Sequence, residues 1–153
     1  MVGRFEQFSS FISGIQRSIQ RLQREEMIKY GLTGAYAQYL VAMHRFTDGI
    51  TAAELCEVCD KDKAAVSRII ANMVKKGLVT RKEQNKNLYR ALLFLTEEGK
   101  KAAQYVMERA KIAVEKAGSG LSEADRDKFY SALNLIAKNL QSICKEGLPN
   151  PST

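Results

Sequence analysis

The chain has 153 residues, of which 45% are hydrophobic and 27% charged, and this composition excludes disordered and fibrous classes. Its 24 Lys and Arg against 17 Asp and Glu give a net charge of +7, which favours a polyanionic partner such as nucleic acid or an acidic membrane face. No apolar run approaches the roughly 20 residues that span a bilayer, and the start of the chain lacks the pattern of a secretion signal. We therefore expect a cytoplasmic protein without membrane association, whose three cysteines are reduced.

The first predicted element is a helix from about Arg4 to Lys29. Its apolar residues recur at alternating spacings of three and four, which forms a heptad seam along one helical face. The members of this first seam are Phe5, Phe8, Ile12, Ile15, Ile19 and Leu22.

Side chains that accept hydrogen bonds from a first helical turn mark the next helices. Thr33 precedes a predicted helix that reaches about Phe46. Thr51 and Glu54 have the spacing of a capping box and open a short helix to about Val58. A further amphipathic helix is predicted over 61–76, and it stops at Gly77, the residue type best suited to a left-handed C-cap.

A basic β-hairpin is predicted after this helix. The residues at 78–82 and 88–95 are rich in strand formers, and the polar residues at 84–87 form the turn between them. Between Asp60 and Arg90 the sequence has nine Lys and Arg against three Asp and Glu, so nearly all the excess positive charge lies there.

Two more helices complete the chain. Thr96 caps a helix that reaches about Ala117, and the glycines at 118 and 120 separate it from a last helix that starts near Ser122. The last helix carries a second seam, formed by Phe129, Leu133, Ile136, Leu140 and Ile143. From both seams we assign to dimerisation the residues Phe5, Phe8, Ile12, Ile15, Ile19, Leu133, Ile136, Leu140 and Ile143, the alternative being a helix pair within one chain.

The order of helix, turn, basic helix and hairpin is that of a winged helix-turn-helix, so the predicted fold class is mainly α with a small β-hairpin wing. A helix fits the major groove of DNA, where side chains read base edges while Lys and Arg neutralise phosphates. The expected partner is double-stranded DNA. The helix is expected to contact it through Lys61, Lys63, Ala64, Ala65, Ser67, Arg68, Asn72 and Lys75, and the wing through Arg81, Lys82, Asn85, Lys86, Asn87 and Arg90.

From Leu32-Thr33 to Leu95-Thr96-Glu97-Glu98-Gly99-Lys100 the sequence resembles the MarR (multiple-antibiotic-resistance regulator) family. The resemblance is strongest over Asp62-Lys63-Ala64-Ala65-Val66-Ser67-Arg68-Ile69-Ile70 and Lys75-Lys76-Gly77-Leu78-Val79 with Arg81. It implies a homodimeric regulator with interlocking terminal helices, often a repressor that releases an inverted-repeat operator when a small molecule or an oxidant acts. One feature departs from the family: the wing signature Asp-x-Arg falls on Asn87 and Tyr89. Either Arg90 replaces its arginine or the hairpin is longer than usual.

This interpretation divides the chain into a helical dimerisation region at 1–30 and 97–147, a DNA-binding region at 31–96 within one compact domain, and a flexible tail at 148–153. An aromatic effector site is expected where the family commonly has its pocket, and its predicted members are Tyr30, Tyr36, Tyr39, Met43 and His44. Buried packing of these side chains is the simpler alternative.

The sequence offers no glycine-rich phosphate loop, no set of metal ligands and no nucleophile with a base, so neither an enzyme nor a cofactor is expected. Two alternatives to a ligand-responsive regulator stay open. Cys56 and Cys59, at i and i+3, allow a thiol-based redox sensor, although small buried apolar residues are the simpler interpretation. A winged-helix module that docks on protein, or binds nucleic acid only for architecture, is the other.

Overall fold

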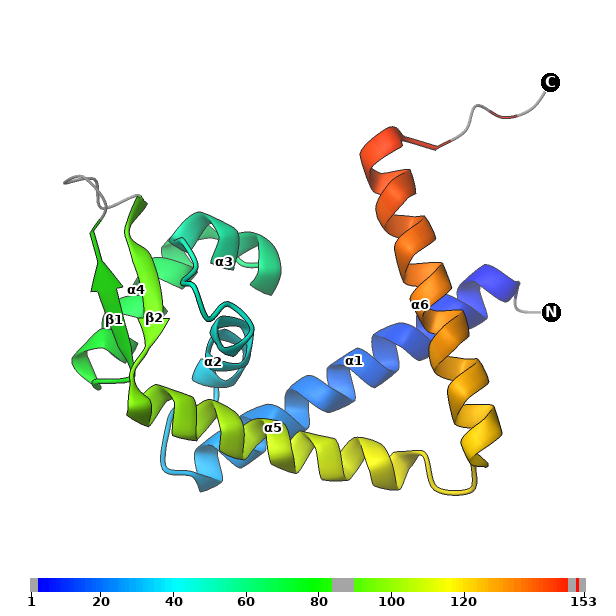
Figure 1. Ribbon diagram of the computed structural model, residues 1–153, viewed down its shortest axis with the longest axis horizontal. Coiled ribbons are helices and arrows are strands. Elements are labelled where there is room, and N and C mark those ends of the chain that lie inside the picture. The colour runs from blue at the N-terminus through cyan, green and yellow to red at the C-terminus, as the bar shows by residue number, and fades with distance from the viewer. Residues whose placement is uncertain (1–2, 84–89, 149–150, 152–153) are drawn as a thin grey trace. The chain divides into compact units, whose positions relative to one another are not determined.

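The computed structural model describes residues 3–83, 90–148 and 151 (Figure 1). Along these ranges the elements are α1 (Arg4–Lys29), α2 (Tyr36–His44), α3 (Ala52–Cys59), α4 (Lys63–Lys75), β1 (Val79–Lys82), β2 (Leu92–Leu95), α5 (Glu97–Ala117) and α6 (Glu123–Glu146). This order confirms a mainly helical chain with a two-stranded hairpin. The chain divides into two compact units, with the boundary after Val114 inside α5.

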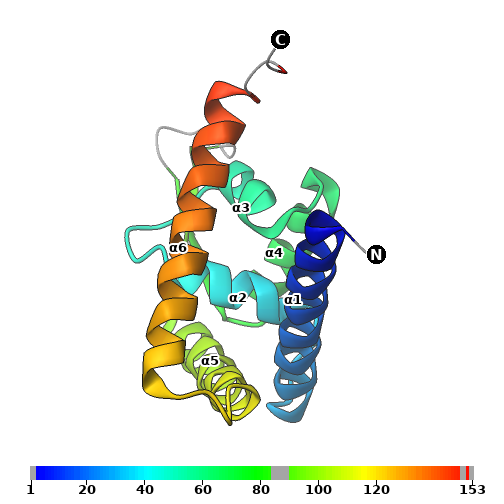
Figure 2. The same cartoon turned by 90° about the vertical axis from the view of Figure 1, so that its right-hand side faces the viewer.

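The first unit is built around α2. This helix is apolar on nearly all sides, and every residue from Tyr36 to Met43 except Gln38 is buried. α2 contacts α1, α3 and β2 (Figures 1 and 2). The fully buried side chains come from all the elements of this unit and include Met27, Leu40, Ile50, Leu55, Val66, Ile70, Met73, Val79 and Val106.

The start of α2 differs from the prediction. Thr33 does not cap the helix, because its carbonyl oxygen accepts the Tyr36 N–H at 3.0 Å in a preceding turn and the N-cap residue is Ala35, without a side-chain cap. Gly34 allows α1 and α2 to approach closely, since a β-carbon there would lie 3.2 Å from the Arg24 carbonyl oxygen. The helix ends at His44, two residues before the expected Phe46.

β1 and β2 pair antiparallel, with Val79 opposite Leu95 and Lys82 opposite Leu92. Ile50 adds a third short segment to this sheet, because its N–H and C=O both bond to Leu93, at 3.2 and 2.8 Å. The sequence did not predict this pairing, since one apolar residue between Gly49 and Thr51 has no strand periodicity. It attaches the wing to the entrance of the helix-turn-helix.

The second unit contains the end of α5 and all of α6. The separating turn is closed by Arg126, whose guanidinium donates a 2.9 Å hydrogen bond to the Gly118 carbonyl oxygen. Ser122 caps α6 by accepting the Asp125 N–H at 3.1 Å, as expected from the sequence. α6 has no buried residue along its 24 positions.

Candidate nucleic-acid interface

α4 has one buried and one exposed face. Val66, Ile70 and Met73 are at most 2% exposed and fix the helix against the core. Most of the predicted DNA-contacting residues of this segment are exposed, and only Ala65 is half-buried; the exposed ones are Lys61, Lys63, Ala64, Ser67, Arg68, Asn72 and Lys75. The helix therefore presents a polar, cationic surface together with one small apolar side chain, Ala64.

Two aspartates define the turn before α4. Asp60 ends α3 in the left-handed conformation (φ 51°), and the Lys61 N–H bonds to the Cys56 carbonyl oxygen at 3.0 Å. The Asp62 side chain then accepts the Ala65 N–H at 2.8 Å and starts the new helix. The prediction that this helix begins at Lys61 was wrong by two residues, because Asp62 is the cap and not part of the helix. Lys61 lies in the turn.

The wing adds cations beside this helix. Arg81, Lys82 and Arg90 are exposed, and the Lys82 ammonium lies 4.8 Å from the centroid of the Phe94 ring, a cation–π arrangement. The other predicted wing contacts, Asn85, Lys86 and Asn87, lie outside the described residues, as does the start of the expected second strand at Leu88. The described part of that strand begins at Leu92, so Arg90 precedes it.

The five predicted effector residues have different environments. Tyr36, Tyr39 and Met43 are 2–3% exposed and belong to the core, and burial raises the pKa of Tyr39. Tyr30 is 38% exposed and its ring packs on Tyr105 with centroids 5.1 Å apart. His44, half-buried, ends α2. None of the five lines either of the two cavities found among the described residues.

The predicted dimerisation residues are largely uncovered in each unit taken separately. In α1, exposure is 80% for Phe5, 38% for Phe8, 40% for Ile12 and 52% for Ile15, and Ile19 is half-buried. In α6 the exposed seam members are Ile136, Leu140 and Ile143, while Leu133 is half-buried. Both helices thus present apolar rows that nothing in their own unit covers.

A MarR-family sequence model matches residues 30–87, which span α2, α3, α4 and β1. A Bacillus subtilis (strain 168) protein described as an uncharacterised HTH-type transcriptional regulator, YybA, is 26% identical over 132 residues, covering 85% of this chain and 86% of the relative. The chain belongs to the MarR family. Because such proteins regulate transcription, this member is a transcription regulator and not an enzyme.

Solved MarR-family structures extend the likeness to most of the chain. A putative regulator from Listeria monocytogenes complexed with 26mer DNA is 25% identical, with a TM-score of 0.72 and coverage of 94% of this chain and 97% of that one. A MarR regulator from Methanosarcina mazei Go1 is also 25% identical, with a TM-score of 0.77 and coverage of 90% and 99%. The winged helix-turn-helix prediction is thereby confirmed. In the part of the chain that the structure describes, no helix is both long and apolar enough to cross a membrane.

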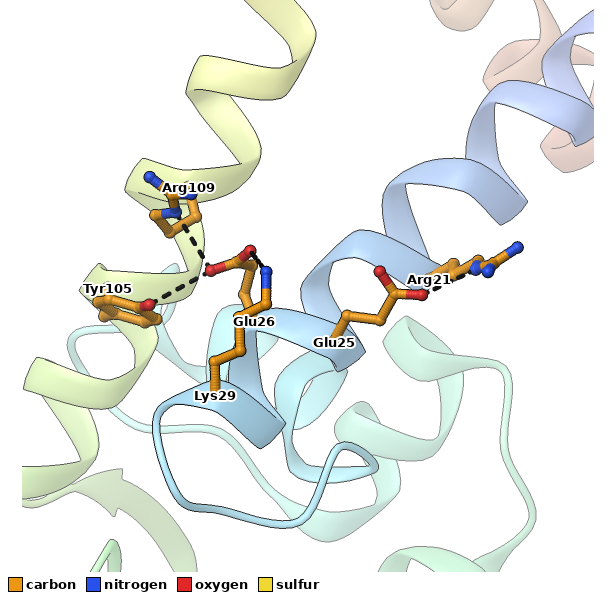
Figure 3. A network of polar contacts seen from close by, with 6 residues as sticks. All are labelled: Arg21, Glu25, Glu26, Lys29, Tyr105 and Arg109. Atoms are coloured by element: carbon orange, nitrogen blue, oxygen red, sulfur yellow. Dashed lines mark hydrogen bonds and ion pairs between the residues drawn. The ribbon is translucent and has the colours of Figure 1, made fainter.

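A buried carboxylate that the sequence reasoning missed connects α1 to α5 in this MarR-family chain (Figure 3). Glu26 is 7% exposed and accepts from Lys29 at 2.7 Å, Arg109 at 3.1 Å and the Tyr105 hydroxyl at 3.2 Å. The hydrogen bond from Lys29, helped by Arg109, holds the pKa of Glu26 below its usual value against the opposing effect of burial. Its partners are 79 and 83 residues away along the chain, so only a long-range pairing signal would have revealed them.

The cysteines of this MarR-family chain are free thiols in different environments. Cys59 donates a long hydrogen bond, 3.9 Å, to the Gln38 carbonyl oxygen, and burial raises its pKa to about 11. Such a thiol is a poor nucleophile at neutral pH. Cys56 is half-buried and Cys144 exposed. Over residues 3–83 and 90–148 no group of three or more His, Cys, Asp or Glu is placed to hold a metal ion.

Proposed function

We propose that this MarR-family chain is a sequence-specific double-stranded DNA-binding repressor that acts as a homodimer on an inverted-repeat operator. The observation that carries the proposal is the exposed side of α4, where Lys63, Ser67 and Arg68 lie near its first turns. A recognition helix inserts its N-terminal residues into the major groove, so these side chains are suited to reading bases. The Listeria monocytogenes relative, crystallised with DNA, supports this assignment.

Most of the proposed contacts surround that helix with positive charge. Lys61, Lys75, Arg81, Lys82 and Arg90 are exposed on both sides of it along the chain. Their role is to neutralise phosphates, a contribution that is independent of sequence and weakens with salt. Because its partner is the chromosome, we place the protein in the cytoplasm.

Selection of bound duplexes from a random pool tests the function directly. The purified protein should enrich a two-fold symmetric sequence, and its affinity for that duplex should exceed the affinity for a scrambled duplex by about 10³-fold or more. A steep decrease of affinity with salt should accompany both. Equal affinity for all duplexes would indicate an architectural binder, and salt-independent behaviour without DNA uptake would indicate a protein-docking module.

The homodimer is proposed from the uncovered apolar rows of α1 and α6. Exposed apolar rows of this length are expected to be buried in solution. A two-fold dimer would place its recognition helices roughly 34–36 Å apart, one turn of DNA. Light scattering should give twice the chain mass of 17.1 kDa. A monomer at micromolar concentration would instead favour pairing of the two rows within one chain.

Repression and its release by a small aromatic acid complete the proposal. The candidate site is formed by Tyr30, Tyr36, Tyr39, Met43 and His44. Since Tyr36, Tyr39 and Met43 are in the core, a ligand there must displace packed side chains, so its binding would move α2 against α1 and α5. Calorimetry with a panel of phenolic acids, combined with a reporter gene behind the selected operator, tests both parts. Absence of uptake across the panel, or a reporter that the protein activates, would contradict them.

A further inference from the structure

A cavity of about 620 Å³ lies between α3, α4 and the wing. Its apolar lining consists of Ala52, Ala53, Ile70, Ala91 and Leu93, of which Ile70 and Leu93 are 2–3% exposed. The volume is that of a site for a small organic molecule. An apolar lining of this kind favours the hydrocarbon part of such a molecule.

Charged and polar side chains complete the lining. Lys63, Ser67 and Arg81 contribute two cations and a hydroxyl, and Glu57 contributes the one carboxylate among the lining residues. The cations therefore outnumber the carboxylate, which favours a ligand with a single negative charge. Lys63, Ser67 and Arg81 are also among the proposed DNA contacts, so a molecule held by them competes with the DNA backbone and bases.

Cys56 gives this cavity a reactive group. It is the cysteine among the lining residues, whereas Cys59, on the same helix, is not part of the lining and has a pKa raised by burial. The positions of Cys56 on α3, Ser67 on α4 and Arg81 on β1 place a thiol, a hydroxyl and a guanidinium around one space. Cations beside a thiol favour its reaction as the thiolate.

We propose that this cavity binds a small amphipathic carboxylate with an electrophilic carbon–carbon double bond, and that Cys56 adds to it covalently and thereby prevents DNA binding. In the reaction the Cys56 sulfur forms a bond to the carbon β to the carbonyl group. The π bond of the alkene breaks, and the proton lost by the thiol is balanced by one gained at the α carbon, so no oxidant is consumed. The consequence for DNA rests on the proposed function, but the labelling of Cys56 does not.

The labelling experiment compares three maleimides of similar size and different charge: 4-maleimidobutyric acid, N-ethylmaleimide and N-(2-aminoethyl)maleimide. Each rate at Cys56, measured by tandem mass spectrometry, is divided by the rate of the same reagent with neutral N-acetylcysteine amide. The acid should react with Cys56 on the order of tenfold faster than the neutral reagent, the lower end of electrostatic steering, and the amine should react most slowly. Arg81→Gln should bring the three ratios together. Equal ratios in the unaltered protein, or no adduct at Cys56, would overturn the proposal.

The consequence for DNA is measured on the same samples. The acid adduct should lose at least tenfold in affinity for the selected duplex, and Cys56→Ser should bind that duplex with or without the reagent. Prior addition of the duplex should protect Cys56. Retained affinity of the adduct, or a loss that accompanies unfolding in circular dichroism, would overturn the inference. If the unlabelled protein binds no duplex at all, the proposed function fails, while the labelling ratios still decide the cavity.

Discussion

The hydroxyl group of Thr96 donates a 2.6 Å hydrogen bond to the carbonyl oxygen of Gly77. The same oxygen accepts the Gly99 N–H at 3.1 Å, in the first turn of α5. One side chain thus connects the end of the proposed recognition helix to the start of α5 across the base of the wing. The position of α4 relative to α5 depends on this connection.

Thr96→Val tests it, because valine keeps the shape of threonine and removes the hydroxyl. We expect a loss of about 1–2 kcal/mol in the free energy of unfolding, since Gly77 loses its donor and Gly99 its cap. Urea denaturation at one fixed protein concentration measures the effect. Thr96→Ser is the matched control and should retain most of the stability; an equal loss in both variants would mean that the methyl group, not the hydrogen bonds, matters.

Gly99 permits the close packing of α5 on the segment after α4. A β-carbon at this position would overlap the carbonyl oxygen of Leu78, which already accepts the Thr96 N–H at 3.0 Å. Gly99→Ala should therefore destabilise the protein by about 1–3 kcal/mol through overpacking. Gly14→Ala is the opposite case, because nothing lies within 4 Å of a β-carbon there, and it should stabilise α1 by about 0.5–1 kcal/mol. Thermal denaturation distinguishes the two, and the same sign for both would contradict the packing argument.

The network around Glu26 predicts a pH dependence of stability. Because the pKa of Glu26 is lower in the folded chain than its usual value near 4.3, its ionised form stabilises the fold above that pH, and the stabilisation is lost as pH decreases through the folded pKa. Glu26→Gln should lower the urea midpoint most near pH 7, with a difference that shrinks below about pH 4. The neighbouring Glu25→Gln is the control, since Glu25 pairs with an Arg21 side chain that is 82% exposed. A difference for Glu26→Gln that grows with acid would contradict the assignment.

The sequence was sufficient for the elements whose signals are local. The Thr51–Glu54 capping box is present, with hydrogen bonds of 3.2 and 2.8 Å, and the two-glycine break after Ala117 separates α5 from α6 as predicted. The missed features all depend on residues distant in sequence. Ile50 pairs with Leu93, Glu26 meets Arg109, and the cavity collects Cys56, Ser67 and Arg81 from separate elements. Periodicity reports which face of a helix is buried, but not which partner covers it.

The proposed DNA interface predicts different effects for two cations of α4. Arg68, near the start of the helix, should contact a base or its adjoining phosphate, so Arg68→Ala should weaken operator binding by about 1–3 kcal/mol and reduce the preference over scrambled duplex. Lys75, in the last turn, should contact phosphate, so Lys75→Ala should weaken both duplexes similarly and reduce the salt slope by about 0.9. Fluorescence anisotropy at several salt concentrations measures both. Lys138→Ala, on α6, removes the same charge away from the interface and should change neither value; identical, negligible effects of all three would contradict the orientation of α4.

The seam of α6 predicts where the homodimer is vulnerable. Leu140 is 48% exposed and lies in the row that contains Ile136 and Ile143, so Leu140→Glu would place a charge inside the proposed interface. Sedimentation velocity should show dissociation to a species of 17.1 kDa at micromolar concentration, with a parallel loss of DNA affinity because the two half-sites are no longer bound together. Ser142→Glu introduces the same charge on the opposite face of the helix and should remain dimeric. If both variants stay dimeric, the row on α6 does not form the interface; if both dissociate, added charge anywhere on α6 is sufficient and the seam has no special role.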